Sequence, residues 1–204
     1  KMATADGTEI SRKMLRFTKA RKITTEFVSC DIRDLIRQSI DFTMPRWKSM
    51  AQSKGINYHI DTKNINEVPL ILCNPAELRE IIINIINNAI DAMPDGGRLS
   101  FGTWSKENTI FMNISDTGEG MSYEVKKRIF DPFFTTKLAI GTGLGMSITY
   151  GIITGHGGKI DVESEEGKGT TFTLQFPVTA TVKSDILKGF PEKKQEIKYN
   201  NLRI

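Results

Sequence analysis

Asparagine side chains at helical spacing are the first candidates for chemistry in this chain. One face of a helix predicted over 77–92 carries four polar residues at intervals of four, four and three: Glu80, Asn84, Asn88 and Asp91. Asn is a poor helix former, because its amide competes with the backbone for hydrogen bonds. Its oxygen suits Mg²⁺, which keeps several waters and takes few protein ligands. Asn84 and Asn88 are therefore candidate metal ligands, although a solvated polar face explains the pattern equally well.

The loop Asp116-Thr-Gly-Glu-Gly-Met121 follows a segment that alternates like a strand. A carboxylate at the end of a strand can accept a hydrogen bond from the exocyclic amine of adenine, where guanine has a carbonyl. Gly118 and Gly120 would let the backbone approach the base closely, and Met121 ends the segment. Taken alone, an ordinary Asp/Gly turn is the simpler interpretation.

The stretch 130–137 reads Phe-Asp-Pro-Phe-Phe-Thr-Thr-Lys and is too apolar for a simple exposed loop. We expect Phe130, Phe133 and Phe134 to anchor the hinge of a mobile segment in the core. Lys137 would then contact the γ-phosphate of a nucleotide under that segment, and a solvated Lys is the alternative.

A glycine-rich loop comes next and opens a helix predicted over 145–154. Backbone N–H groups at a helix N-terminus bind anions through hydrogen bonds and the helix dipole. The loop lacks the Gly-Lys-Ser/Thr end of a Walker loop and does not follow a strand as GxGxxG does. The candidate phosphate-binding residues here are Gly141, Thr142, Gly143, Leu144, Gly145 and Met146.

These residues need elements that hold them in place. Asn74 followed by Pro75 is a strong helix start, and that helix runs to about Met93. Its predicted buried stripe is Leu78, Ile82, Ile85, Ala89 and Ala92. An earlier helix starts at Asp31, and Pro45 is expected to bend or interrupt it near its end. The other predicted elements are an amphipathic helix over 6–21, a short helix over 122–129, and strands over 57–61, 98–104, 109–115, 159–164 and 170–177.

Composition fits a soluble globular protein, with 204 residues, 39% hydrophobic and 25% charged. The formal net charge is +4, but it is unevenly distributed. Residues 1–22 carry seven basic and two acidic side chains and residues 180–204 carry six and three, so the ends account for +8 and 23–179 for −4. An acidic centre argues against nucleic acid as a partner.

No stretch is apolar enough to span a bilayer, since the run Ile81-Ile-Ile83 ends at Asn84. Cys30 and Cys73 lack CxxC spacing and are expected to be free thiols in a reducing compartment. We therefore expect a cytoplasmic location, with any membrane association of the parent protein arising from upstream segments.

The order of the four segments, within about seventy residues, is more specific than any one of them. The chain resembles the catalytic and ATP-binding domain of sensor histidine kinases, in the ATPase superfamily shared with DNA gyrase, mismatch-repair ATPases and a heat-shock chaperone. The resemblance covers about residues 30–178. Its motifs are the N box at Glu77–Met93, the G1 box at Asp116–Met121, the F box at Phe130–Lys137 and the G2 box at Gly141–Met146.

The resemblance implies a two-layer α/β sandwich, a mixed sheet backed by helices, with ATP bound between helices and lid. It implies Mg²⁺ at Asn88 together with Asn84, adenine at Asp116, and Thr170 or Thr171 nearby through water. The implied partners are a phosphoacceptor-histidine helix of the same or a second protomer, a second copy in a homodimeric parent protein, and a response-regulator receiver domain.

The resemblance also suggests the domain organisation. Residues 1–22 resemble the C-terminal part of the dimerisation helical hairpin, 30–178 the catalytic domain, and 179–204 a linker. The end Leu202-Arg-Ile204 resembles the opening of the first strand of a receiver domain, so we hypothesise a hybrid kinase in which a receiver follows. An unstructured tail is the alternative.

One position bears on reaction type. In the superfamily's ATPases a Glu one turn before the metal-binding Asn activates water, and here that position is Asn84, whose carboxamide cannot abstract a proton. Transfer to an external histidine is therefore favoured, and His59 and His156 are better explained structurally than as acceptors. The alternatives are a superfamily ATPase that drives conformational change and a catalytically silent nucleotide-binding module.

Overall fold

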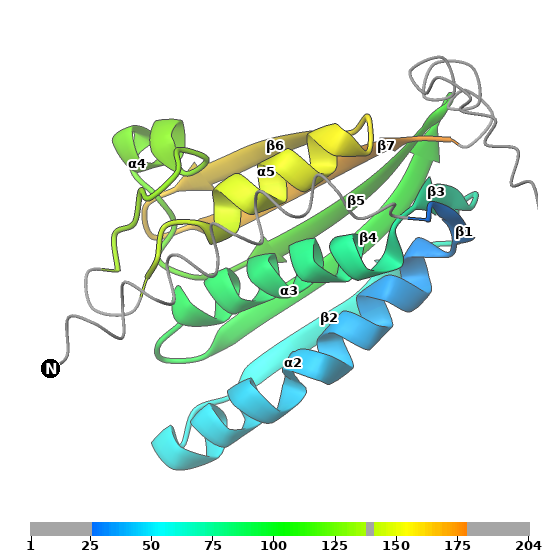
Figure 1. Cartoon of the computed structure of the whole chain (residues 1–204). Helices are drawn as coiled ribbons and strands as arrows, with labels where there is room; N and C mark the ends of the chain where they lie inside the picture. The colour runs from blue at the N-terminus through cyan, green and yellow to red at the C-terminus, as the bar shows by residue number, and fades with distance from the viewer. Residues whose placement is uncertain (1–25, 138–140, 179–204) are drawn as a thin grey trace, which may run out of the picture.

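The computed structural model describes residues 26–137 and 141–178, and the expectations for 1–22 and 179–204 lie outside these ranges. Three helices pack on one face of a five-stranded mixed sheet (Figure 1). The elements, in chain order, are β1 (Val28–Cys30), α2 (Ile32–Lys54), β2 (Tyr58–Ile65), β3 (Ile71–Cys73), α3 (Pro75–Asp91), β4 (Gly97–Lys106), β5 (Thr109–Asp116), α4 (Tyr123–Arg128), α5 (Gly145–Gly155), β6 (Lys159–Glu165) and β7 (Gly169–Pro177). The predicted α/β two-layer architecture is confirmed.

The large sheet has the strand order β2-β4-β5-β7-β6. Strands β2 and β4 are parallel, and the remaining neighbours are antiparallel. The last two predicted strands are present as β6 and β7, which pair antiparallel as a hairpin. Its register places Thr170 beside Asp116, so the last residue of β5 lies next to the start of β7. The short strands β1 and β3 form a separate antiparallel pair that the sequence pattern does not predict.

Helix α3 lies between α2 and α5 and carries the centre of the core (Figure 1). Its start is as predicted, because the Asn74 side chain accepts a hydrogen bond from the Ala76 N–H at 2.9 Å and Pro75 follows. The buried face is wider than the predicted stripe, and Ala92 is only half-buried because it lies beyond the helix end. The buried residues of α3 are Leu78, Ile81, Ile82, Ile85, Ile86, Ala89 and Ile90.

Helix α2 is not interrupted at Pro45, so that part of the prediction is wrong. The helix continues to Lys54 and ends at Gly55. Proline removes one backbone donor, but Thr43 and Trp47 on either side of it are both buried against the core. Packing of this face outweighs the lost hydrogen bond.

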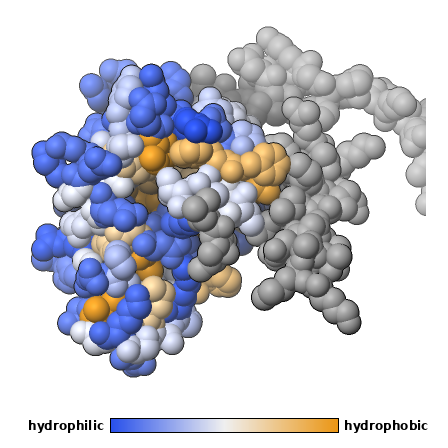
Figure 2. All heavy atoms as spheres, turned by 90° about the vertical axis from the view of Figure 1, so that its left-hand side faces the viewer, coloured by the Kyte–Doolittle hydropathy of each residue, from blue (hydrophilic) through white to orange (hydrophobic). Residues whose placement is uncertain are grey.

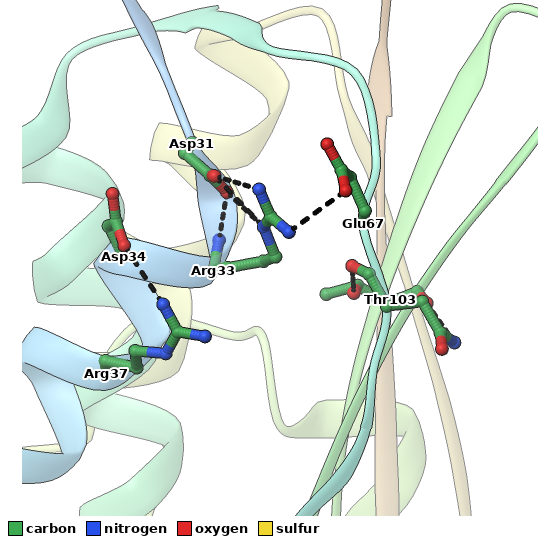
Figure 3. Close-up of polar contacts among 7 residues, drawn as sticks. Asp31, Arg33, Asp34, Arg37, Glu67 and Thr103 are labelled. Carbon is green, nitrogen blue, oxygen red and sulfur yellow. Dashed lines mark hydrogen bonds and ion pairs between the residues drawn. The ribbon is translucent and has the colours of Figure 1, made fainter.

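The start of α2 is fixed by charged contacts (Figure 3). Asp31 caps the helix by accepting from the Arg33 N–H at 2.9 Å, and the Arg33 guanidinium donates to the same carboxylate at 2.7 Å. This side-chain hydrogen bond holds the pKa of Asp31 below its ordinary value. Arg33 also lies 3.7 Å from Glu67, and Arg37 pairs with Asp34 on the exposed side of the helix.

His156 has a structural role, as the sequence predicts. His156 is buried at the end of α5, where its Nε2 accepts from the Asn74 N–H at 3.1 Å and its Nδ1 lies 2.8 Å from the Ile152 carbonyl. It thereby ties the end of α5 to the cap of α3. His59 is exposed on β2. No helix within 26–137 or 141–178 is long and apolar enough to cross a membrane.

Candidate functional site

A groove of about 1130 Å³ opens where α3 and β5 end and α5 begins. These ends lie together on the left side of Figure 1. Figure 2 views that side and shows apolar surface between hydrophilic side chains. The groove is also bordered by the loop after β5, by the stretch 134–137 and by α2. The fold therefore brings all four candidate motifs to one place.

Asp116 lies in this groove with one carboxylate oxygen in use. It is 7% exposed, and its Oδ1 accepts from the Gly118 N–H at 2.8 Å and the Thr170 N–H at 3.2 Å. No donor in the described part of the chain reaches Oδ2. Burial raises the pKa of Asp116, against the opposing effect of the two backbone donors. A buried, oriented carboxylate with a free oxygen is suited to accept a hydrogen bond from a ligand.

The glycines after Asp116 make close contacts with protein. A Cβ at Gly118 would overlap the Ala92 carbonyl, and one at Gly120, where φ is +66°, would overlap the Glu165 carbonyl. Packing of the loop onto α3 and the β6–β7 hairpin therefore accounts for both glycines. Gly120 lines the groove and Gly118 does not.

The polar end of α3 forms a charged cluster with the stretch before α5. Lys137 Nζ lies 2.9 Å from Asp91 Oδ2 and 3.5 Å from Asn88 Oδ1. These three side chains line the groove, as the sequence predicts for a common site. Asn84, also on α3, does not line the groove. Its side chain faces the start of α5, where its Cγ lies 3.9 Å from the position that a Cβ would take at Gly145.

The stretch 130–137 is anchored differently from the prediction. Phe130 packs against the core and Phe134 lines the groove. Phe133 is 52% exposed, so its expected anchoring role is wrong. Its backbone is held instead, because its N–H donates to the Gly143 carbonyl at 2.9 Å with φ at +67°.

The glycine-rich loop lies against that stretch. At Gly143, φ is +64° and a Cβ would overlap the Phe133 backbone, so only glycine fits there. Helix α5 then begins after Leu144, which provides no side-chain cap for the first N–H groups. Leu144 is buried, whereas the other loop residues named above line the groove: Gly141, Thr142, Gly143, Gly145 and Met146.

The two threonine candidates lie on opposite sides of β7. Thr170 lines the groove next to Asp116. Thr171 is directed away, and its hydroxyl lies 2.7 Å from that of Ser115. The structure thus brings only Thr170 to the site.

Helix α2 supplies groove residues that sequence reasoning missed. Arg46, Met50 and Lys54 line the groove, and Arg46 NH2 lies 2.5 Å from Asp91 Oδ1. Their four-residue spacing places them on one helix face. That spacing was the signal in the sequence for a shared face. The contact with Asp91 could not be predicted from it, because α2 and α3 are far apart in the sequence.

The observed residues fit a nucleotide and a hard cation. Asn88 Oδ1 already faces an ammonium group, so it can face Mg²⁺. The first N–H groups of α5 and Lys137 offer donors to phosphate, and Asp116 Oδ2 offers an acceptor to a base.

The sequence is similar to those of known proteins. The family described as histidine kinase-, DNA gyrase B- and HSP90-like ATPase matches residues 73–180. Sporulation kinase E of Bacillus subtilis is 40% identical over 149 residues, which cover 72% of this chain and 19% of that protein. The signal transduction histidine-protein kinase AtoS of Escherichia coli is 32% identical over 190 residues, which cover 81% and 31%.

Solved structures share the fold. The catalytic domain of histidine kinase ThkA has a TM-score of 0.63 at 30% identity, covering 75% of this chain and 96% of that one. Full-length ShkA in complex with AMPPNP has a TM-score of 0.63 at 28% identity, covering 76% and 32%. ThkA in complex with the response regulator TrrA has a TM-score of 0.62 at 26% identity, covering 85% and 49%.

The chain spans only 19% and 31% of the length of the two kinases it matches in sequence, and nearly all of the solved ThkA catalytic domain. The chain belongs to the family of histidine kinase-, DNA gyrase B- and HSP90-like ATPases, and it contains the ATP-binding catalytic domain of a histidine kinase.

Proposed function

We propose that this domain binds Mg²⁺–ATP and transfers the γ-phosphate to a histidine on a helix outside these 204 residues, in the same or a second protomer. The observation that carries the proposal is the groove itself. It contains the Asp116 carboxylate, of which only Oδ1 accepts hydrogen bonds from the described residues, the amide oxygen of Asn88 and the ammonium group of Lys137. The start of α5, which has no side-chain cap, also borders it.

Asp116 would select the base. Its Oδ1 is occupied by two backbone donors, so Oδ2 would accept from the exocyclic amine of adenine. Guanine would present a carbonyl to the same oxygen, and two acceptors repel. Thr170, whose N–H orients Asp116, would contribute its hydroxyl through water.

Asn88, Lys137 and the start of α5 would take the phosphates. Of the two predicted metal ligands only Asn88 lines the groove, and it would hold Mg²⁺, which when bound offsets the charge of phosphate oxygens. Lys137 and the N–H groups that start α5 would donate to the phosphates and orient the γ-phosphoryl group. Such fixed donors stabilise the charge that develops during transfer.

Transfer is favoured over hydrolysis because of Asn84. This residue occupies the position from which a Glu would activate water, and a carboxamide cannot act as a base. Without that base, the nucleophile has to be supplied by another segment or molecule. Steady ATP hydrolysis remains the competing function.

The parent protein is proposed to be a cytoplasmic-facing homodimer whose partner is a response-regulator receiver domain. ThkA, which shares the fold, has been solved in complex with a response regulator. The acidic centre of the chain supports a protein partner over nucleic acid.

Labelling with γ-labelled ATP tests the transfer. The longer protein that contains the acceptor helix should gain an acid-labile, base-stable label, as a phosphohistidine does. This chain alone should take up none and release little phosphate. Steady phosphate release by the chain alone, at the rate at which the longer protein is labelled, would favour the ATPase instead.

A further inference from the structure

Asp91, the last residue of α3, holds two cations from distant parts of the chain. Its Oδ1 lies 2.5 Å from Arg46 NH2 of α2, and its Oδ2 lies 2.9 Å from Lys137 Nζ. All three side chains line the groove. A single carboxylate therefore divides its charge between two positive groups beside the proposed phosphate site.

Lys137 also contacts the proposed metal ligand. Its Nζ lies 3.5 Å from Asn88 Oδ1. An ammonium and a divalent cation repel each other and cannot share one amide oxygen. Lys137 must therefore leave Asn88 when Mg²⁺ binds there.

The two cations are held differently. Arg46 is fixed by a fork, since its NH1 donates to Asn87 Oδ1 at 2.6 Å while NH2 contacts Asp91. Both side chains are partly exposed, 38% for Lys137 and 46% for Arg46, but Lys137 carries a point charge on a flexible stem and lacks a planar fork. Lys137 is the group that can move, and Arg46 is the group that stays.

We propose that Asp91 and Arg46 are positioning residues that set how strongly Lys137 competes with Mg²⁺ for Asn88. This inference rests on the proposed function. The Asp91 carboxylate holds Lys137 at Asn88, and Arg46 weakens that hold by neutralising part of the carboxylate's charge. Phosphate oxygens of an incoming nucleotide give Lys137 another partner, so metal and nucleotide together release it.

The test measures ADP affinity by calorimetry with Mg²⁺ and with a chelator, for the unmodified chain, Asp91→Asn and Arg46→Met. The quantity compared is the ADP affinity with Mg²⁺ divided by the ADP affinity with the chelator. The ratio should rise about two- to fivefold in Asp91→Asn and fall by a similar factor in Arg46→Met, the size expected for partly exposed ion pairs. Asp34→Asn and Arg37→Met, which break an exposed pair on α2, should leave it unchanged.

These signs separate the proposal from simpler effects. If Asp91 only attracted or ligated Mg²⁺, its loss would lower the ratio, and the loss of Arg46 would raise it. In a Lys137→Met background, both substitutions should lose the shifts proposed here. A ratio that is unchanged, or that shifts in the opposite direction, overturns the inference.

The outcomes also separate this inference from the proposed function. An unmodified chain that binds no ADP in either condition would overturn both. Binding by the unmodified chain without the two opposite shifts would overturn only the role of Asp91 and Arg46. Thermal unfolding of each variant shows whether it is folded during the titration.

Discussion

Asp116→Asn should abolish most of the affinity for adenine nucleotides while preserving the fold. Two backbone N–H groups donate to Oδ1, so the oxygen of the new amide must take that position and its NH₂ must face the ligand. The charged acceptor for the adenine amine is lost, and two donors then face each other. Losing a hydrogen bond to a charged group and leaving a buried donor unpaired costs about 2–4 kcal/mol, roughly 30- to 1000-fold in affinity.

The stability of this variant separates binding from folding. Burial raises the folded-state pKa of Asp116, so this group favours folding fully below its unfolded pKa, and that contribution is lost as pH rises through the folded pKa. At neutral pH the ionised carboxylate is therefore a cost, which the neutral amide lacks. The Tm of Asp116→Asn at pH 7 should be equal to or above that of the unmodified chain.

The assay is calorimetric titration of Mg–ADP and Mg–GDP into the unmodified chain, Asp116→Asn and a control. Asp161→Asn is the matched control, because Asp161 is exposed on β6 in the same sheet. In Asp116→Asn, the amide NH₂ would donate to the guanine carbonyl, so the preference for ADP over GDP should shrink. A loss of ADP affinity below about threefold, with the fold intact, would refute the assignment of the base site.

Three further predictions concern pH, the glycine loop and the core. Burial raises the pKa of Asp116, so its carboxylate becomes protonated at a pH where an ordinary Asp is still ionised. Calorimetry should therefore show that ADP affinity decreases as pH is lowered through that range. An ADP affinity that does not change there would contradict this. Gly143→Ala meets the Phe133 backbone at positive φ, so it should weaken ADP binding at least about tenfold, while Gly151→Ala, with open space around it, should not. Ile82→Ala should lower the free energy of unfolding in denaturant titration by about 2–5 kcal/mol, since Ile82 is fully buried, and a loss below about 1 kcal/mol would count against tight packing there.

The sequence predicted an element best where both the side chain and the backbone of a residue favour the same structure. Asn74 and Pro75 mark the start of α3 because both satisfy needs of the first helical turn. The prediction at Pro45 was wrong because the hydrogen bond lost at this proline is outweighed by the burial of Thr43 and Trp47 on either side of it. The strands β1 and β3 have three residues each, too few for a period to show.

Sequence order predicted which motifs meet, but it could not predict the contacts between them. Asp116 and Asn88 are in the groove as expected. The Arg46 contact to Asp91 joins helices that are adjacent only in the fold. The prediction for Phe133 was wrong because it rested on apolar character alone, which does not reveal that this residue has a positive φ and an exposed ring.

In the proposed function, this groove binds an adenine nucleotide through Asp116 at the base and Asn88 at the metal. Titration of Mg–ADP into the unmodified chain, with Mg–GDP in parallel, tests it most directly. We expect one ADP bound per chain, weaker binding when Mg²⁺ is chelated, and little or no binding of GDP. Equal binding of ADP and GDP, or no binding of either by the folded chain, would contradict it.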